Sequence, residues 1–249
     1  MADGNIYDDP DFHAGYVTLD RQVRGLAGAA EWPVLQTMVP PLGGARVVDL
    51  GCGFGWFSRW AVEQGAVAVL GVDVSTRMLE RARADTDMAA VTYQQHDLQQ
   101  LTLAPDSADL VFSSLALHYV KDIVRLLSVA STALAPGGSL VFSVEHPIFS
   151  APTSQGFETS AAGDQVWPLN DYLVEGERNR TWFVDGVVKH HRTVATWLNA
   201  VIAAGCSVER VVEWGPSPAD IEERPELAQD LHRPWFLLIG ATKLPAQTG

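Results

Sequence analysis

Between residues 46 and 145, short apolar runs alternate with amphipathic segments. We expect the apolar runs to form strands, at residues 46–50, 67–72, 91–95, 108–113 and 139–145. Helices are expected between them, over 54–64, after an N-cap at Ser75, and over 122–134. Strands and helices that alternate at this spacing predict an α/β fold with a doubly wound, mostly parallel sheet.

The flanking segments complete this architecture. Two short helices are expected over 17–30 and 31–39. After residue 146 the chain becomes rich in aromatic and turn residues, which we interpret as a lid or small antiparallel insertion over the carboxyl-terminal edge of the sheet. A helix over 193–204 and strands over 207–214 and 235–242 then bring the sheet to seven strands. We therefore divide the chain into an N-terminal helical cap (1–44), a cofactor-binding α/β core (45–146), a lid or substrate insertion (147–192) and a C-terminal completion of the core (193–249).

The first expected strand runs into a turn with glycines at alternate positions, Asp49-Leu50-Gly51-Cys52-Gly53-Phe54-Gly55. Glycine permits backbone conformations that a Cβ forbids and lets a ligand approach the main chain closely. Asp73, at the end of the second strand, is positioned to accept hydrogen bonds from ribose hydroxyls. Together these features indicate a site for a nucleoside cofactor.

The glycine spacing and Asp49 distinguish between cofactors. The dinucleotide fingerprint G-x-G-x-x-G brings the backbone to a pyrophosphate. Here the pattern is D-x-G-x-G-x-G, and the Asp49 carboxylate would repel a pyrophosphate but attract the ammonium group of a methionine moiety. The stretch resembles motif I of the class I S-adenosylmethionine-dependent methyltransferases.

Later stretches resemble, in order, the successive motifs of the ubiquinone/biotin-synthesis type within that superfamily: residues 71–75, 96–98, 109–119, 134–139 and 233–243. The match covers residues 46 to 145 well, and the remainder looks like a bacterial subgroup without an assigned substrate. The resemblance implies a Rossmann-like methyltransferase fold. It also implies transfer of a methyl group from S-adenosyl-L-methionine to a small-molecule O, N or carboxylate acceptor, with S-adenosyl-L-homocysteine as product.

The resemblance implies a set of cofactor contacts, position by position. The residues expected to face the methionine portion are Asp49, Gly51, Cys52, Gly53 and Phe54, with the Ser113 carbonyl directed at its ammonium group. Asp73 is expected to bind both ribose hydroxyls. The residues expected around the adenine are Val74, Met78, Asp97 and Leu98. Tyr16 could close the site from the N-terminal segment, together with Tyr7, or both tyrosines could simply pack on the sheet.

Methyl transfer requires alignment of the acceptor and, for some acceptors, removal of a proton. The candidate catalytic residues are His118, Glu145, His146 and His190. They could instead hold Mg²⁺, but that ion prefers oxygen ligands, so we expect no metal. The lid aromatics expected near the substrate are Trp167, Tyr172 and Trp182. They could stack on a flat acceptor, or form a hydrophobic cluster that stabilises the insertion.

Composition narrows the partners and the location. The chain of 249 residues has a formal net charge of −13, which disfavours nucleic acid because that partner needs a basic face. Two cysteines do not suggest a disulfide framework. No apolar run is long enough to span a membrane, and residues 1–4 do not begin a signal peptide. We therefore expect a cytoplasmic monomer or homodimer that acts on a small molecule.

Two other functions stay open. A nicotinamide-dependent oxidoreductase would share this type of sheet, although Asp49, the glycine spacing and the lack of a Tyr-x-x-x-Lys pair speak against it. A protein that binds S-adenosylmethionine without catalysis would not need to retain the intact loop and both Asp73 and Asp97.

Overall fold

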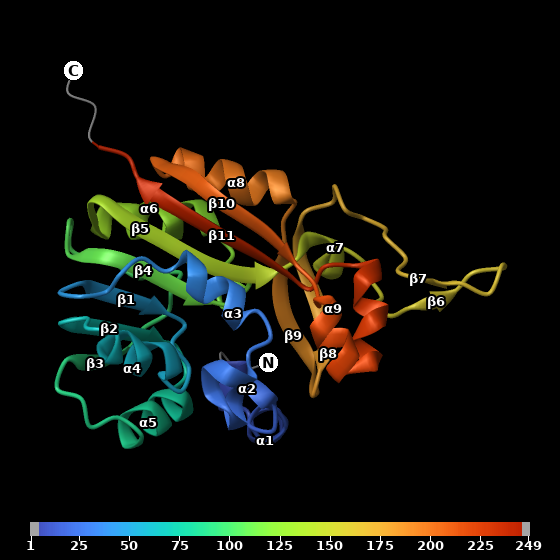
Figure 1. The fold of residues 1–249 in the computed structure, drawn as a ribbon, viewed down its shortest axis with the longest axis horizontal. Coiled ribbons are helices and arrows are strands. Elements are labelled where there is room, and N and C mark those ends of the chain that lie inside the picture. Colours follow the sequence, from blue (N-terminus) through green and yellow to red (C-terminus); the bar gives the residue numbers. More distant parts are fainter. Residues whose placement is uncertain (1–4, 246–249) are drawn as a thin grey trace.

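The computed structural model describes residues 5–245 and is built on one seven-stranded sheet (Figure 1). Its strands are β1 (Arg46–Leu50), β2 (Ala68–Asp73), β3 (Val91–Gln95), β4 (Ala108–Ser114), β5 (Leu134–Glu145), β10 (Cys206–Trp214) and β11 (Phe236–Lys243). The order is β10-β11-β5-β4-β1-β2-β3, in which β11 is antiparallel to both neighbours and the other pairs are parallel. The predicted doubly wound, mostly parallel fold is confirmed.

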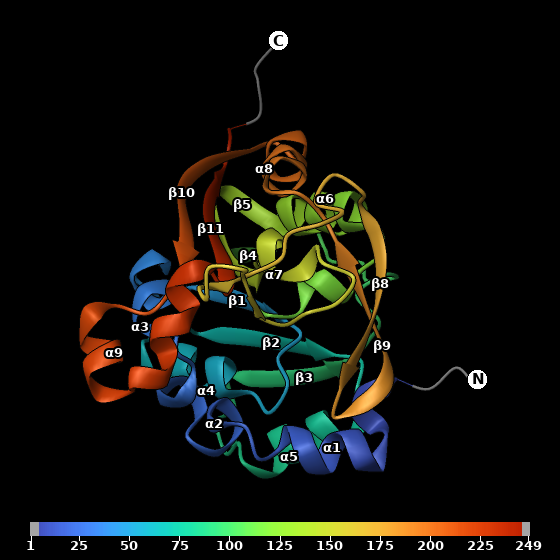
Figure 2. The ribbon, with the colours of Figure 1, turned by 90° about the vertical axis from the view of Figure 1, so that its right-hand side faces the viewer.

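Helices cover both faces of this sheet (Figures 1 and 2). The α-helices are α1 (Pro10–Tyr16), α2 (Asp20–Val23), α3 (Trp32–Leu35), α4 (Trp56–Glu63), α5 (Thr76–Ala84), α6 (Ile123–Ala133), α7 (Pro147–Ser150), α8 (Val194–Ala203) and α9 (Pro218–Glu223). The 3₁₀ turns are η1 (Ile6–Asp8), η2 (Gly25–Gly28), η3 (Gln36–Met38), η4 (Leu117–Tyr119) and η5 (Pro225–His232). Helices α6 and α8 share one buried apolar cluster with the sheet, while α3 and α4 share a second. Two separate cores, one on each face, therefore hold the sheet in place.

The N-terminal region differs from the expected helix over 17–30. The structure has α2 and η2 there, because Gly25 interrupts the helix with a left-handed φ of 61°. A Cβ at Gly25 would collide with the Trp56 ring, so the break lets the cap approach α4. An additional helix, α1, forms where none was expected, and the Asp9 side chain caps it by accepting from the backbone N–H groups of Asp11 and Phe12.

After β5 the chain forms two antiparallel pairs outside the main sheet. The short pair β6 (Glu158–Thr159) and β7 (Gln165–Val166) extends away from the body as an arm (Figure 1). The longer pair β8 (Gly176–Trp182) and β9 (Val184–His191) is a hairpin beyond the carboxyl ends of the parallel strands (Figure 1). Its strand β9 contacts η4, which follows β4. The hairpin thus lies at the edge of the sheet where ligands of such folds bind.

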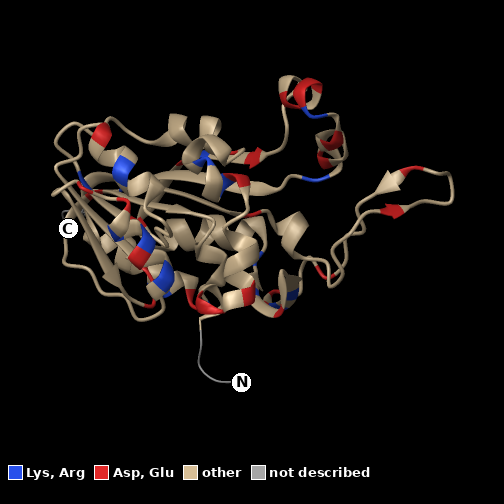
Figure 3. Ribbon diagram, turned by 90° about the horizontal axis from the view of Figure 1, so that it is seen from below, with Lys and Arg blue, Asp and Glu red and all other residues tan. Residues whose placement is uncertain are grey.

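Charge is distributed unevenly over these elements. Acidic residues recur on the β6–β7 arm and on the α9–η5 excursion (Figure 3).

Within residues 5–245, no helix is long and apolar enough to cross a membrane.

Candidate active site

The glycine loop leaves β1 at the point where the chain order of the sheet reverses, between β1 and β4. Gly51, Gly53 and Gly55 all have left-handed backbones, with φ of 73°, 52° and 73°. A Cβ at Gly51 would collide with Ala116, and one at Gly55 with the Tyr93 hydroxyl. By contrast, nothing lies within 4 Å of the Cβ position at Gly53. The loop is therefore packed at both ends and open in the middle, as expected of a backbone that a ligand approaches.

Asp73 fixes this loop to the end of β2. Its Oδ2 accepts from the Gly53 N–H at 2.8 Å, and its Oδ1 accepts from the Ser75 N–H at 2.9 Å. Burial raises the pKa of the Asp73 carboxyl, although these backbone hydrogen bonds oppose the effect.

Asp49 is a carboxyl group buried near the end of β1. It is 2% exposed, and its hydrogen-bond partner in the described part of the chain is the Ser58 hydroxyl, 2.7 Å from Oδ2. Burial raises the pKa of Asp49 to about 7, against the opposing effect of the Ser58 hydrogen bond. A cation next to Asp49 would relieve the cost of ionising it.

Asp49 and the loop line a pocket of about 80 Å³ that also contains a cation. Arg21 lines the same pocket, and its Nη2 donates to both carboxylate oxygens of the buried Glu31, at 2.6 and 2.8 Å. The Trp56 side chain lines it too, and its buried Nε1–H has no hydrogen-bond partner among the described residues. A carboxylate and a guanidinium on one small pocket are complementary to the ammonium and carboxylate of an α-amino acid.

Sequence reasoning missed Arg21 and Trp56. Arg21 lay in a segment interpreted only as a cap helix, and its partner Glu31 is ten residues away, outside the spacing of helical ion pairs. Trp56 directly follows the glycine loop, but it lies in a segment for which only a helix, over 54–64, was expected. Arg21 could have been identified from the sequence as a basic residue in a segment expected to cover the site.

The residues expected to bind the adenosine follow β2 and β3, whereas Ser113, expected at the methionine ammonium, lies near the end of β4. Val74 is 39% exposed, whereas Met78 and Leu98 are buried. Asp97 Oδ1 accepts from the Gln99 N–H at 2.8 Å, which leaves its other oxygen for a ligand. The Ser113 hydroxyl donates to the Leu50 carbonyl at 2.7 Å and so ties β4 to β1 below the loop.

The N-terminal segment covers this region. The Asp8 carboxylate accepts from the Ser75 hydroxyl at 2.6 Å and from the Arg77 N–H at 3.2 Å. Tyr7 packs edge-on against Tyr16 and Tyr119, with ring centroids 5.1 and 5.8 Å apart. Tyr16 lines the pocket with Arg21. The cap thus lies across the ends of both β2 and β4.

His118, on η4, is poorly suited to remove a proton. Its Nδ1 accepts from the Glu145 N–H at 3.4 Å, so the ring carries its proton on Nε2. Burial lowers the pKa of His118 to about 3, and the opposing attraction of Glu145 does not compensate. His118 is therefore neutral at physiological pH and a hydrogen-bond donor at its free nitrogen.

His146 and His191 are held by structural contacts, whereas His190 lies on the outer face of the hairpin. His146 caps α7 by accepting from the Ile148 N–H at 3.0 Å, and its Nε2 lies 2.8 Å from Glu213. His191 lies between the Ser150 hydroxyl, at 2.8 Å, and the Tyr172 carbonyl, at 2.9 Å. His190 lies on the face of β9 opposite the buried Lys189 and His191.

Lys189, which sequence reasoning also left without a role, faces inward. Its Nζ lies 2.5 Å from Glu145 Oε1, and both side chains are largely buried. It also lies 4.7 Å from the centroid of the Trp182 ring and 5.6 Å from that of Tyr119. Burial favours the neutral form of Glu145, but the ion pair with Lys189 outweighs it and lowers the pKa of this carboxyl.

The three lid aromatics lie in different surroundings. Trp182 packs against Tyr16, with ring centroids 5.8 Å apart, and so borders the pocket. Trp167 donates to the Ile148 carbonyl and stacks on Phe149, with Arg233 over its ring at 4.5 Å. The Tyr172 hydroxyl accepts from the Val194 N–H at 3.3 Å. The structure therefore brings Trp182, but not Trp167 or Tyr172, next to a residue of the pocket.

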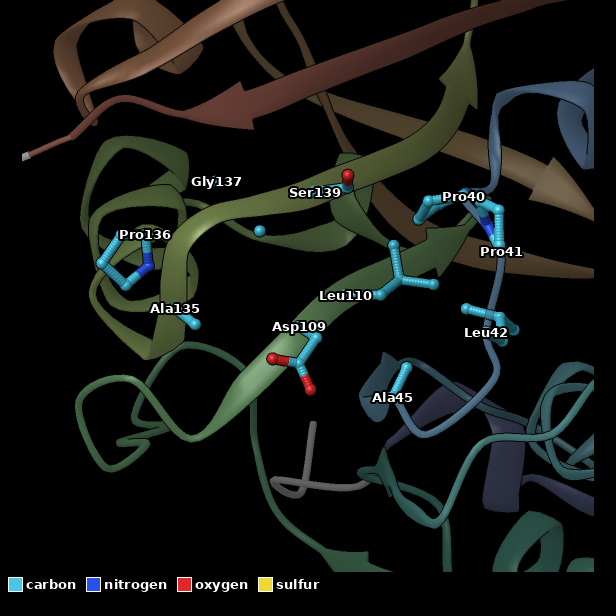
Figure 4. A pocket seen from close by; sticks show the side chains of 11 residues that line it. Pro40, Pro41, Leu42, Ala45, Asp109, Leu110, Ala135, Pro136, Gly137 and Ser139 are labelled. Carbon is cyan, nitrogen blue, oxygen red and sulfur yellow. The ribbon is translucent and has the colours of Figure 1, made fainter.

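A second hollow of about 210 Å³ lies at the amino-terminal ends of the parallel strands (Figure 4). Pro40, Asp109 and Ser139 are among its lining residues, and Asp109 is paired with Arg46 at 2.9 Å. Ligands of such sheets bind at the opposite edge, so this hollow does not contribute to the site. Among the described residues, no group of three or more His, Cys, Asp or Glu side chains could hold a metal ion.

The fold and the pocket together define an α/β enzyme class that binds a nucleoside carrying an amino acid. Comparisons with known proteins agree. Residues 48–142 match the family model described as a methyltransferase domain. The structure aligns with an S-adenosylmethionine-dependent methyltransferase from Mesorhizobium loti at 55% identity and a TM-score of 0.85, over 88% of this chain and 100% of that one.

Two further relatives support the same family. A putative S-adenosylmethionine-dependent methyltransferase from Listeria monocytogenes is 38% identical, with a TM-score of 0.82, over 89% of this chain and all of that one. Trans-aconitate 2-methyltransferase from Deinococcus radiodurans is 36% identical over 52% of this chain and 51% of its own length. The chain thus spans about half of that relative. The protein belongs to the S-adenosylmethionine-dependent methyltransferases.

Proposed function

We propose that the protein methylates a small-molecule acceptor, with the methionine end of S-adenosylmethionine bound between Asp49 and Arg21. The observation that carries this proposal is that a carboxylate, Asp49, and a guanidinium, Arg21, line the same pocket beside an open glycine loop. The bound cofactor supplies an activated methyl group on a sulfonium centre. The protein's own task is then to bind, orient and exclude water.

Each residue of the pocket has a role in this proposal. Asp49 accepts a hydrogen bond from the cofactor ammonium and offsets its positive charge. Arg21 would donate to the cofactor carboxylate, and so would the Trp56 Nε1–H, a buried donor without a hydrogen-bond partner among residues 5–245. Glu31 positions Arg21.

The adenosine would lie at the neighbouring strand ends. Asp73 would accept from the ribose hydroxyls through the lone pairs left free by Gly53 and Ser75. Val74, Met78 and Leu98 would pack against the adenine, and Asp97 would accept from its amino group. The closeness of Asp73 to the loop supports this arrangement.

A small acceptor fits the coverage of the site. The cap closes over the ends of the strands through Tyr7 and Tyr119, and the hairpin reaches the pocket through Trp182 and Tyr16. Such an enclosure favours small molecules over folded macromolecules, because the acceptor must enter between the cap and the hairpin. The β8–β9 hairpin is accordingly the substrate-binding part of the insertion in this proposal.

Arg21→Lys tests the carboxylate contact. A lysine is a point charge that cannot bond Glu31 and a ligand carboxylate with the fixed geometry of a guanidinium. We expect the affinity for S-adenosylhomocysteine, measured by calorimetry, to fall about tenfold, the scale of one charge-assisted hydrogen bond. Binding of 5′-methylthioadenosine, which lacks the amino acid, should not change.

Arg24→Lys is the matched control, because Arg24 is an exposed neighbour at 62%. It should bind both ligands like the unaltered protein. An equal loss of both ligands in Arg21→Lys would contradict the proposed role and indicate a general distortion of the cap. Incorporation of labelled methyl into protein rather than into the low-molecular-mass fraction would contradict a small acceptor.

A further inference from the structure

The inner face of the β8–β9 hairpin carries an excess of positive charge. Alternation along the two strands places Arg178, Arg180 and Lys189 on this face, with Trp182 beside them. Arg180 and Lys189 are each only 7% exposed. Buried cations are costly unless anions compensate them, so their partners are informative.

These cations face few anions. Arg180 donates to the carbonyls of Ser150 and Thr153, at 2.6 and 3.0 Å. Arg178 likewise donates to carbonyls, among them that of Val174 at 2.6 Å. Within residues 5–245, the carboxylate in an ion pair with this face is Glu145, through Lys189. Three cations thus oppose one carboxylate, in a chain whose net charge is −13.

Lys189 is the cation best placed to meet an acceptor. An ammonium group has three N–H donors, and Glu145 occupies one of them. The rings of Trp182 and Tyr119 flank the remaining directions, and Trp182 contacts Tyr16 of the cofactor pocket. A negatively charged group between these rings would lie beside the cofactor and would offset the excess charge.

The groups near Lys189 that could accept a proton indicate the chemical class of this anion. His118 and His146 each accept a backbone N–H, and His190 lies on the outer face of the hairpin. Glu145 is held as a carboxylate by Lys189 and is a weak base. Phenols, alcohols and amines must lose a proton during methylation, whereas a carboxylate is already ionised at neutral pH.

We propose that the acceptor is a small carboxylic acid, bound as its anion against Lys189 and converted into a methyl ester. This inference rests on the proposed function. A carboxylate oxygen uses a lone pair to form the new C–O bond, the C–S bond breaks, and its electron pair stays on sulfur as S-adenosylhomocysteine leaves; no proton is transferred.

The chemical stability of the product tests the proposal. The protein is incubated with methyl-labelled S-adenosylmethionine and a panel of small di- and tricarboxylic acids, catechol and ethanolamine, and in parallel with a low-molecular-mass bacterial extract. We expect label in a product that mild alkali converts into volatile methanol, as for an ester. Alkali-stable label, in an ether or a methylamine, would overturn the carboxylate class. Binding of S-adenosylhomocysteine without any methylated product would also overturn it, whereas failure to bind it would refute the proposed function itself.

Variants test the role of Lys189 on the best acid of the panel. Lys189→Met combined with Glu145→Gln removes both charges together, so that neither is left buried alone. We expect the KM for the acid to rise at least tenfold, with S-adenosylhomocysteine affinity unchanged. Lys121→Met, on the exposed residue before α6, is the matched control and should keep the KM. An unchanged KM in the double variant would exclude Lys189 as the anchor.

Discussion

At the scale of single residues, Asp49 is a position where ligand binding and the stability of the protein have opposite requirements. A carboxyl group with one hydroxyl partner in a buried position destabilises the protein when it ionises. The same group is well matched to a cationic ligand, which removes that cost on binding. The ionisation of Asp49 therefore makes both the affinity for the ligand and the stability of the protein depend on pH.

Binding should depend on pH through Asp49. With a pKa of about 7, roughly a tenth of the free protein has Asp49 ionised at about pH 6 and most of it at about pH 8. We expect the affinity for S-adenosylhomocysteine to rise about tenfold over this range in calorimetric titrations. Asp49→Asn should bind more weakly and lose this dependence, and an unaltered pH profile in this variant would exclude Asp49 as the group responsible.

The stability of the unliganded protein should change in the opposite sense. The pKa of Asp49 is about 7 in the folded protein and near 4 when unfolded, so the folded state binds more protons between these values. Its contribution to stability is thus fully present below about pH 4 and is lost as pH rises from there through 7, by on the order of 4 kcal/mol. Asp49→Asn should therefore raise Tm at about pH 8 but not at about pH 4. A lower Tm for the Asp49→Asn variant at both pH values would contradict this explanation.

At the scale of elements, the cap and the hairpin make the site, and both are joined to the core by contacts between residues far apart in sequence. The cap is attached to α5 by Asp8, while the hairpin meets η4 and β5 through Lys189 and Glu145. Neither attachment is local in sequence, since Asp8 and Ser75 are 67 residues apart.

Loss of the Asp8 contact should loosen the cap. Asp8→Ala removes the acceptor for Ser75 and Arg77, a loss of about 1 kcal/mol by analogy with helix caps. We expect faster hydrogen exchange in η1 and α1, with exchange in β1 and β4 unchanged. Asp11→Ala, at an exposed position of α1, is the control. Equal protection in the Asp8 variant would show that the aromatic contacts alone hold the cap.

At the scale of the whole molecule, the parallel core could be predicted from sequence because its signals are local. Apolar runs, the glycine loop and the acids at the ends of β1 and β2 depend on neighbouring residues, and the sheet bears out the strands expected from them. The cap could not be predicted as well, because the break at Gly25 follows from packing against Trp56. The residues on the inner face of the β8–β9 hairpin could not be predicted either. Without the register of β8 and β9, the choice between Lys189 and His190 cannot be made.

The remaining differences between the expected and the observed site come from side-chain contacts between residues far apart in sequence. His146 was expected to act on the acceptor, but Glu213 from β10 and the α7 backbone occupy its ring. Arg21 was missed because Glu31, which orients it, follows an irregular segment. Burial and pairing of this kind emerge only when distant elements meet, so sequence identifies the candidates but not their partners.

The most direct measurement of the central claim is a crystal structure of the protein with S-adenosylhomocysteine. We expect the ligand's ammonium within hydrogen-bonding distance of Asp49, its carboxylate at Arg21 and Trp56, and its ribose at Asp73. A ligand whose amino acid end points away from Asp49 and Arg21 would contradict the proposed binding mode.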